Sequence, residues 1–271
     1  MFPGAVADRV DAEYAIVGTP LDVSTTFQPG TRFGPDRIRR FARSYEDYDH
    51  RTDRRFSECA VYDHGDIYAG GDPEDYLTYL AGLCRELRAD GIVPLLLGGE
   101  HTVTVAGVRA VDPEVVIVLD AHLDLRETYD DDPWSHACAT RRALETADEA
   151  VILGGRAGCE AEWQRAAADD VSVVPPEEVP EWSPTDLSDA SVYLSVDIDV
   201  VDPAVAPGTG TMEPFGLSSR ECRDLVRAVA PYADGFDVVE VNDRDDGQSA
   251  ALAAKLLRTF VYEHASADNA D

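Results

Sequence analysis

Short apolar runs recur along the chain, and most are followed by an amphipathic stretch. The runs are rich in Val, Ile and Leu without alternating polar positions, which is typical of strands buried on both faces. The strand candidates are residues 14–18, 93–97, 115–120, 151–154, 171–174, 192–199 and 237–241. The helix candidates are residues 35–44, 75–90, 102–110, 141–149, 160–169, 218–230 and 248–264.

This alternation of strands and helices predicts an α/β fold of three layers, with a mostly parallel central sheet between two layers of helices. No internal repeat, low-complexity tract or linker divides the 271 residues. We therefore expect a single domain over residues 1–271. The small and polar residues 265–271 predict a frayed tail.

The charge of the chain narrows the possible partners. It has 53 acidic and 23 basic residues, a formal net charge of −30, and Lys255 is its only lysine. Such a chain repels phosphates, so nucleic acids and anionic membranes are not expected as partners. An acidic, lysine-poor composition is typical of a high-salt cytoplasm, where salt screens the self-repulsion. We therefore expect a halophilic protein.

The cysteines and the start of the chain indicate the compartment. The five cysteines are odd in number and lack zinc-type spacing, which argues against a disulfide framework. The first residues show neither the basic region nor the apolar run of a leader, and no apolar stretch approaches ~18 residues. A soluble, cytoplasmic protein is expected.

Acids and imidazoles follow four of the predicted strands, each time at the carboxyl end. In open α/β sheets, ligands bind beyond the carboxyl ends of the strands, so these four segments are expected to meet at one edge. The residues are His101, Asp120, His122, Asp124, Asp197, Asp199 and Glu240.

This set of side chains predicts a metal site. Asp120, His122 and Asp124 have the spacing that places side chains on one face of an extended chain. So many carboxylates at one edge would repel one another, and a divalent cation removes that cost. Carboxylates and imidazoles without a thiolate favour Mn²⁺, or else Co²⁺ or Fe²⁺, over a structural zinc. The number of carboxylates suggests two ions that share ligands.

At these positions the chain resembles the ureohydrolases, the family of arginases and agmatinases. The segments 99–101, 120–124 and 195–203 look like the metal motifs of that family, and segment 206–211 is similar to its substrate loop. Segments 18–22 and 29–35 resemble the agmatinase version. The resemblance covers about residues 14–262. Together with the charge, it makes the chain most like a haloarchaeal agmatinase.

The resemblance implies an arginase-like fold, a homo-oligomer (trimer or hexamer) and two Mn²⁺ ions. The first ion would be held by His101, Asp120, Asp124 and Asp197. The second would be held by His122, Asp120, Asp197 and Asp199, so that Asp120 and Asp197 bridge the pair. The implied reaction is hydrolysis of a guanidino group to urea and an amine, by a hydroxide bound to both metals.

Three further residues receive roles in this chemistry. A pair of cations can activate a shared water for attack on the guanidinium carbon. The Glu240 carboxylate can clamp two guanidinium N–H groups and thereby position that carbon. His136 resembles the family's proton-shuttling histidine, and Thr211 the loop residue that helps to hold the guanidinium.

The substrate is the least determined part. Arg126 departs from the arginase pattern, and the acidic loop from Glu127 through residues 130–132 could attract a distal ammonium, which favours agmatine. Hydrolysis of agmatine gives putrescine and urea. Met212 and Phe215 stand where the family usually has Pro and Gly, so arginine, guanidinobutyrate and aminopropylagmatine stay open. A non-catalytic metal-binding subunit is the remaining alternative, and the complete set of site residues argues against it.

Overall fold

The computed structural model describes residues 1–68, 70–184, 187 and 190–267. Its core is an eight-stranded sheet in the order β4-β1-β5-β10-β9-β6-β7-β8, in which each neighbouring pair is parallel. The strands are β1 (Tyr14–Thr19), β4 (Val61–Asp66), β5 (Val93–Gly98), β6 (Val115–Leu119), β7 (Glu149–Leu153), β8 (Val171–Val174), β9 (Val192–Asp197) and β10 (Ala233–Val239). A separate hairpin pairs β2 (Tyr48–Asp49) with β3 (Arg54–Arg55).

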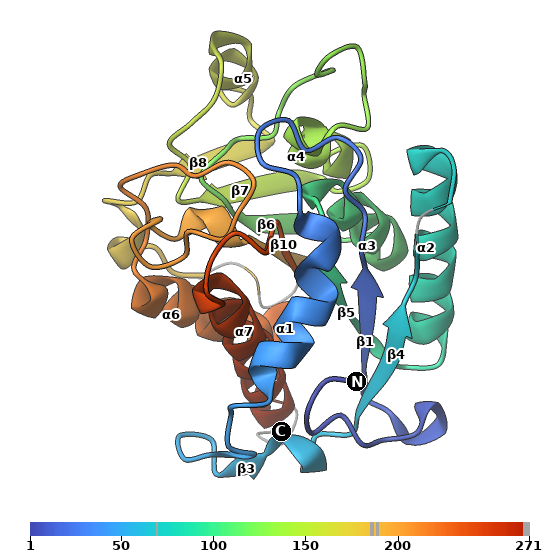
Figure 1. Ribbon diagram of the computed structural model, residues 1–271. Coiled ribbons are helices and arrows are strands. Elements are labelled where there is room, and N and C mark those ends of the chain that lie inside the picture. The colour runs from blue at the N-terminus through green and yellow to red at the C-terminus, as the bar shows by residue number, and fades with distance from the viewer. Residues whose placement is uncertain (69, 185–186, 188–189, 268–271) are drawn as a thin grey trace.

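Helices cover both faces of the sheet (Figure 1). One layer contains α1, α6 and α7, and the other contains α2, α3 and α4. The helices are α1 (Gly34–Ala42), α2 (Pro73–Ala89), α3 (Thr104–Val111), α4 (Ala139–Ala143), α5 (Glu160–Arg165), α6 (Ser219–Val229) and α7 (Gln248–Ala267). The expected three-layer α/β/α fold is confirmed.

Local sequence signals account for where two of the longer helices begin. Asp72 precedes α2, and its carboxylate accepts a hydrogen bond from the Glu74 N–H at 2.8 Å. Ser218 and Glu221 form a capping box at the start of α6. Both arrangements satisfy backbone donors that the first turn of a helix leaves unpaired.

Three elements differ from the sequence prediction. The edge strand β4 was missed because its second half carries Asp, His and Gly and is only partly buried. Helix α4 begins earlier than predicted and has five residues instead of the predicted stretch 141–149. Helix α7 continues to Ala267, so residues 265–267 of the expected tail are helical, and Ala265 is buried in the core. The rest of the expected tail, 268–271, lies outside the described residues.

The order of the strands brings the predicted site together. The four strands that precede the acids and imidazoles, β5, β10, β9 and β6, are neighbours at the centre of the sheet. Because they are parallel, their carboxyl ends lie along one edge. The residues that follow them can therefore meet, as the sequence analysis expected.

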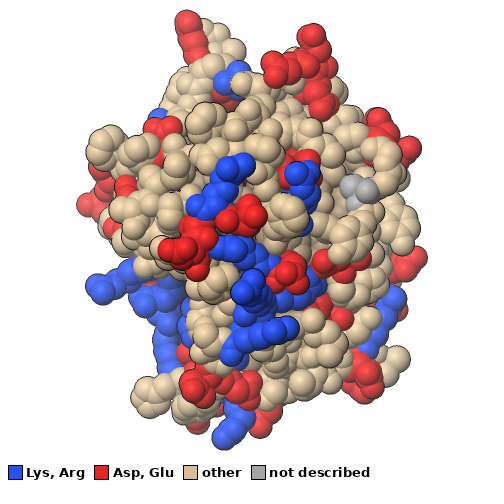
Figure 2. All heavy atoms as spheres, viewed as in Figure 1, with Lys and Arg blue, Asp and Glu red and all other residues tan. Residues whose placement is uncertain are grey.

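The charges are unevenly spread over the face in Figure 2, where basic side chains gather around the region of α1 and acidic ones are more scattered. Helix α1 itself contributes Arg37, Arg39 and Arg40. Among the described residues, no helix is both long and apolar enough to span a membrane.

Candidate active site

His101 lies at the centre of the first group of site residues. It opens a short 3₁₀ helix after β5, and its ring is buried. Its Nδ1 atom lies 2.8 Å from Asp124 Oδ2, 3.1 Å from Asp120 Oδ2 and 3.7 Å from Asp197 Oδ2. One imidazole nitrogen thus faces three carboxylates.

His122 forms the second group. Its Nδ1 atom lies 2.8 Å from Asp199 Oδ2 and 3.7 Å from Asp120 Oδ1. Donor atoms of His101, Asp120 and Asp197 lie within 4.8 Å of one another, as do those of Asp120, His122 and Asp199. Each set could hold a metal ion, and Asp120 belongs to both.

The donor set fits divalent cations. Asp120 Oδ2 is buried and accepts no hydrogen bond within the described part of the chain. Burial and the neighbouring carboxylates Asp199 and Asp120 hold the pKa of Asp197 well above its usual range. Burial and the charge of Asp120 raise the pKa of Asp124 to about 6. Burial and mutual repulsion destabilise the charged form of these carboxylates. A bound proton or cation removes that cost, and the neighbouring imidazoles can serve as further ligands of a cation.

The backbone that carries these residues changes direction at Asp124: His122 still forms a parallel β-bridge with Ala157. Strand β6 ends at Leu119, and Asp124 has a left-handed φ of 50°. Glu240 is also left-handed, with a φ of 60°. Residues with a Cβ rarely adopt this conformation, and it concentrates at functional sites. The left-handed conformation of Asp124 accompanies the approach of its carboxylate to His101 Nδ1, at 2.8 Å.

Glu240 follows β10 and joins the first group to the cavity. Its Oε1 atom accepts a hydrogen bond from the backbone N–H of His101 at 2.8 Å. The side chain is buried, and this burial holds the pKa of the carboxyl well above its usual range. The same oxygen lies 4.0 Å from His136 Nδ1.

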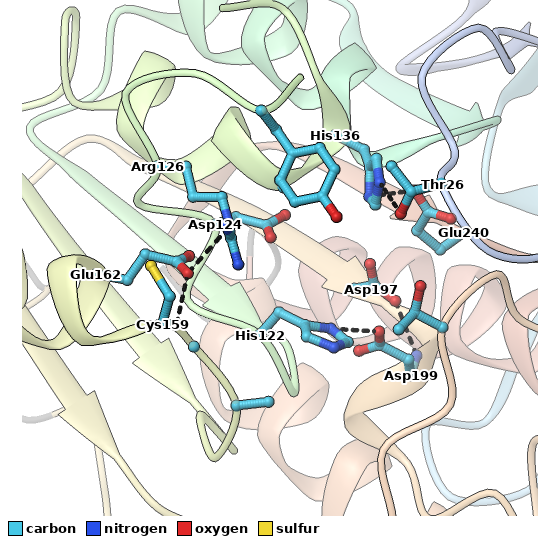
Figure 3. Close-up of a pocket in the computed structure, with 15 residues that line it drawn as sticks. Thr26, His122, Asp124, Arg126, His136, Cys159, Glu162, Asp197, Asp199 and Glu240 are labelled. Carbon is cyan, nitrogen blue, oxygen red and sulfur yellow. Dashed lines mark hydrogen bonds and ion pairs between the residues drawn. The ribbon is translucent and has the colours of Figure 1, made fainter. Parts of the chain in front are cut away.

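A cavity of about 360 Å³ opens over these residues (Figure 3). Its lining includes the predicted residues His122, Asp124, Asp197, Asp199, Glu240, His136 and Thr211, together with Thr26. Arg126, Tyr129, Cys159 and Glu162 also line it. Its volume is near the lower end of the ~300–1,000 Å³ that is usual for small-molecule sites. Most of the predicted site residues therefore line a small-molecule cavity, whereas His101 and Asp120 do not.

His136 stands at the wall of this cavity beside Glu240 and Thr26 (Figure 3). Its Nε2 atom lies 3.4 Å from Thr26 Oγ1. Burial, with the charges of His101 and His122, lowers the pKa of His136 to about 4. The imidazole is therefore neutral near pH 7 in the metal-free chain.

The acidic loop does not have the orientation that the sequence analysis expected. Glu127 is exposed and bonds Arg141 at 2.6 Å and Arg142 at 3.2 Å, outside the cavity over the metal-type groups. From that loop, Arg126 and Tyr129 line the cavity. The Glu127 carboxylate, paired with these arginines, therefore does not face the His/Asp groups, and it lines a neighbouring hollow instead. The attraction of a distal ammonium by the acidic loop stays a prediction.

Sequence reasoning also missed Thr26 and the ion pair between Arg126 and Glu162. The Arg126 Nε atom lies 3.2 Å from Glu162 Oε2, and the guanidinium carbon lies 4.7 Å from the centre of the Tyr129 ring. A Cys159–Glu162 capping box opens α5 and fixes the carboxylate. The capping spacing was the one available signal, and it does not reveal the partner arginine.

Comparisons with known proteins agree with this geometry. The model of the arginase family matches residues 12–262. The chain is 37% identical to an N(1)-aminopropylagmatine ureohydrolase of Thermococcus kodakarensis, over 91% of this chain and 88% of that protein. It is 34% identical to an agmatinase of Pyrococcus horikoshii, over 92% and 91%. The solved agmatine ureohydrolase of Thermoplasma volcanium superposes with a TM-score of 0.92 at 32% identity, over 99% and 95%.

Proposed function

This chain belongs to the arginase family and is a hydrolase acting on C–N bonds, and from that premise we propose that it hydrolyses agmatine to putrescine and urea with two Mn²⁺ ions. The observation that carries the proposal is the pair of His/Asp groups that share Asp120, of which His122, Asp197 and Asp199 line one cavity together with Glu240. Agmatine rather than another guanidino compound is supported by the names of the relatives and not by the acidic loop.

The residues that would hold the first ion are His101, Asp120, Asp124 and Asp197. Those that would hold the second are His122, Asp120, Asp197 and Asp199. The shared position of Asp120 and the three carboxylates around His101 Nδ1 support this assignment. When bound, such a cation pair lowers the pKa of a water and so supplies the nucleophile for a poor electrophile.

Glu240 would bind and orient the substrate. Its Oε1 atom is anchored on the His101 N–H, which leaves Oε2 directed to the guanidinium. Hydrogen bonds between a carboxylate and a guanidinium are charge-assisted and directional, so they fix the planar group over the nucleophile. Thr211 lines the same part of the cavity and would hold a further guanidinium N–H.

His136 would move the proton that the leaving amine needs. In its neutral form it can take a proton released by the attacking water, and it can then donate this proton to the leaving nitrogen. The C–O bond forms and the C–N bond breaks, and the nitrogen leaves as a neutral amine with the proton from His136. The second proton of the water, which carries the positive charge of the original guanidinium, is released to solvent, where the amine becomes an ammonium. The position of the ring at the wall of the cavity, close to Glu240, supports this role.

A second candidate substrate is N-aminopropylagmatine. A further hollow of about 380 Å³ lies beside the cavity, shares Arg126, Cys159 and Glu162 with it, and is also lined by Glu127. This hollow offers room for a longer amine. The relative from Thermococcus kodakarensis, named for that reaction, adds support.

The test is urea release from the purified chain in molar KCl with Mn²⁺. Agmatine, N-aminopropylagmatine, arginine and guanidinobutyrate are compared at equal concentration. We expect the highest kcat/KM with agmatine. Preference for N-aminopropylagmatine would support the second candidate. Urea from arginine or guanidinobutyrate alone would overturn both, and no urea from any of the four would overturn the proposed reaction.

A further inference from the structure

The loop of residues 20–30, between β1 and the next helical turn, is held by backbone hydrogen bonds beside the two His/Asp groups. The Glu100 N–H donates to Leu21 O at 2.8 Å, and the Gly99 N–H donates to Thr19 O at 2.7 Å. A Cβ atom on Gly99 would lie 1.9 Å from Leu21 O, so only glycine allows this close approach. The loop is thereby held against the segment that carries His101.

The buried carboxylate of Glu100 takes most of its hydrogen bonds from that loop. Its Oε2 atom accepts the N–H groups of Val23 and Ser24, both at 2.8 Å. Its Oε1 atom accepts the Ser24 hydroxyl at 3.0 Å, and Thr102 Oγ1 lies 3.2 Å away. A buried carboxylate needs such donors, so the loop and Glu100 hold one another in place.

Ser24 connects this carboxylate to His136. Its hydroxyl donates to Glu100, and its oxygen accepts the backbone N–H of His136 at 2.8 Å. His136 is the first residue of a 3₁₀ helix, where the backbone N–H has no partner inside the helix. One hydroxyl thus satisfies both contacts, using its proton for one and a lone pair for the other. Thr26, two residues along, approaches the His136 ring.

We propose that Ser24 is a positioning residue, which sets His136 at the leaving nitrogen through the relay from Glu100 through Ser24 to the His136 backbone. The inference rests on the proposed function of His136 as a proton carrier. It makes the loop of residues 20–30 part of the catalytic apparatus. Ser24 itself does not line the cavity, so its influence on the reaction passes through His136.

The test compares S24A, which removes both hydrogen bonds, with S24T, which keeps the hydroxyl. Exposed Ser172, on β8, provides the matched control S172A. A positioned general acid contributes ~10²–10⁴-fold to a rate, so its displacement is expected to lower kcat for agmatine ~10–100-fold. In S24A we expect KM and Mn²⁺ affinity, measured by titration calorimetry, to stay within about twofold. S24T and S172A should retain kcat within about threefold.

A second substrate separates positioning from a general structural role. In the oxyguanidino analogue of agmatine, oxygen replaces the methylene next to the guanidino group, and the leaving alkoxyamine is a far weaker base. It needs less protonation, so S24A should be slowed ~10–100-fold with agmatine and only about threefold with the analogue. Equal slowing of both substrates, or unchanged kcat with agmatine, would overturn the proposal.

The position of His136 can also be tested without an activity assay, by NMR spectroscopy. The ¹H–¹⁵N spectrum of the six histidine rings is recorded on the metal-free full chain, and H136N identifies the His136 signals. We expect S24A to shift the His136 signals, and S24T to leave them in place. Unmoved signals in S24A would overturn the relay. If the wild-type chain released no urea, the proposed function would fail, and this spectrum would still decide the placement.

Discussion

Glu240 Oε1 accepts the backbone N–H of His101 at 2.8 Å, so the carboxylate that we propose to bind the guanidinium is joined to the residue after β5 that we propose as a metal ligand. Both side chains are buried, and Glu240 holds its place with a left-handed backbone. The bond uses one oxygen of the carboxylate and leaves the other for a ligand. Damage to the substrate site can therefore be separated from damage to the metal site by the choice of substitution.

E240Q should leave folding and metal binding unchanged and should slow the hydrolysis of agmatine. The amide oxygen of glutamine can still accept the His101 N–H, while the negative charge for the guanidinium is lost. A hydrogen bond to a charged group contributes ~1.5–3 kcal/mol, so kcat/KM for agmatine should fall ~10–150-fold. Bound Mn²⁺ and the melting temperature should stay unchanged.

The comparison variant is E240A, which also leaves the buried His101 N–H without its acceptor. That cost is ~1–3 kcal/mol of unfolding free energy, so E240A should melt earlier than E240Q. Normal kcat/KM in E240Q would contradict the guanidinium clamp.

D120N should remove metal and activity together. Asp120 is the residue that the two candidate groups share, and its Oδ2 atom is buried without a hydrogen-bond donor in the described chain. A neutral amide in that position supplies one weaker oxygen ligand where a bridging carboxylate is expected. We expect less than one Mn²⁺ per chain by elemental analysis and a loss of urea release of at least ~10²-fold.

The control for this substitution is D131N, which removes the same charge from an exposed loop. It should bind metal and turn over like the wild type. Two ions retained in D120N would show that Asp120 does not bridge.

Most of the fold could be predicted because its signals are local. Strands such as β6 are continuous apolar runs, and the residues after them are chemically distinctive. Strand β4 escaped because an edge strand needs no continuous apolar run: in Val61–Asp66 the polar half is partly exposed. The end of α7 escaped because burial of Ala265 depends on packing against distant segments.

The candidate site likewise contains residues that the sequence reveals and residues that it does not. Asp120 and His122 are recognisable because their types and spacing are rare after an apolar strand. Ser24 is not recognisable, since a serine in a loop is common and its partner His136 lies 112 residues away in the sequence. The orientation of Glu127 depends on Arg141 and Arg142, which approach it from a later helix. Such pairings exist only after the chain has folded.

E127Q tests whether the Glu127 carboxylate contacts the substrate. Its carboxylate is exposed and paired with Arg141 and Arg142, and it does not line the cavity over the metal-type groups. Exposed ion pairs contribute ~0–1 kcal/mol, and molar salt weakens them further. The KM for agmatine in molar KCl should therefore stay within about twofold of wild type. A rise of tenfold or more would restore Glu127 as a substrate contact.

H136N should change how the stability of the metal-free chain depends on pH. Burial lowers the pKa of His136 to about 4, below the ~6.5 of an unfolded chain. Between these values the unfolded state binds a proton that the folded state does not, so stability falls as the pH falls from about 6.5 to 4. Asparagine cannot bind that proton.

The free energy of unfolding is measured in urea from pH 4 to 7. Relative to pH 7, H136N should lose less stability at pH 4 than the wild type, by at most ~3 kcal/mol. Exposed His50 provides the control H50N, which should follow the wild type. Parallel curves for H136N and the wild type would contradict the lowered pKa.

F215G should stabilise the chain, because Phe215 occupies a conformation that suits glycine. Its φ is 67°, its side chain is 83% exposed, and its N–H donates to Asp202 Oδ2 at 2.9 Å, which holds the turn in place. A left-handed residue with a Cβ costs ~1–2 kcal/mol, whereas the loss of an exposed ring costs little. Part of the gain is offset by the greater freedom of glycine in the unfolded chain. We expect a rise of ~0.5–1 kcal/mol in the free energy of unfolding.

The control is F27G. Phe27 also has an exposed ring, at 69%, but its backbone is not left-handed. There only the unfolded chain gains freedom, so stability should fall. A fall in F215G as large as that in F27G would show that the turn carries no strain at Phe215.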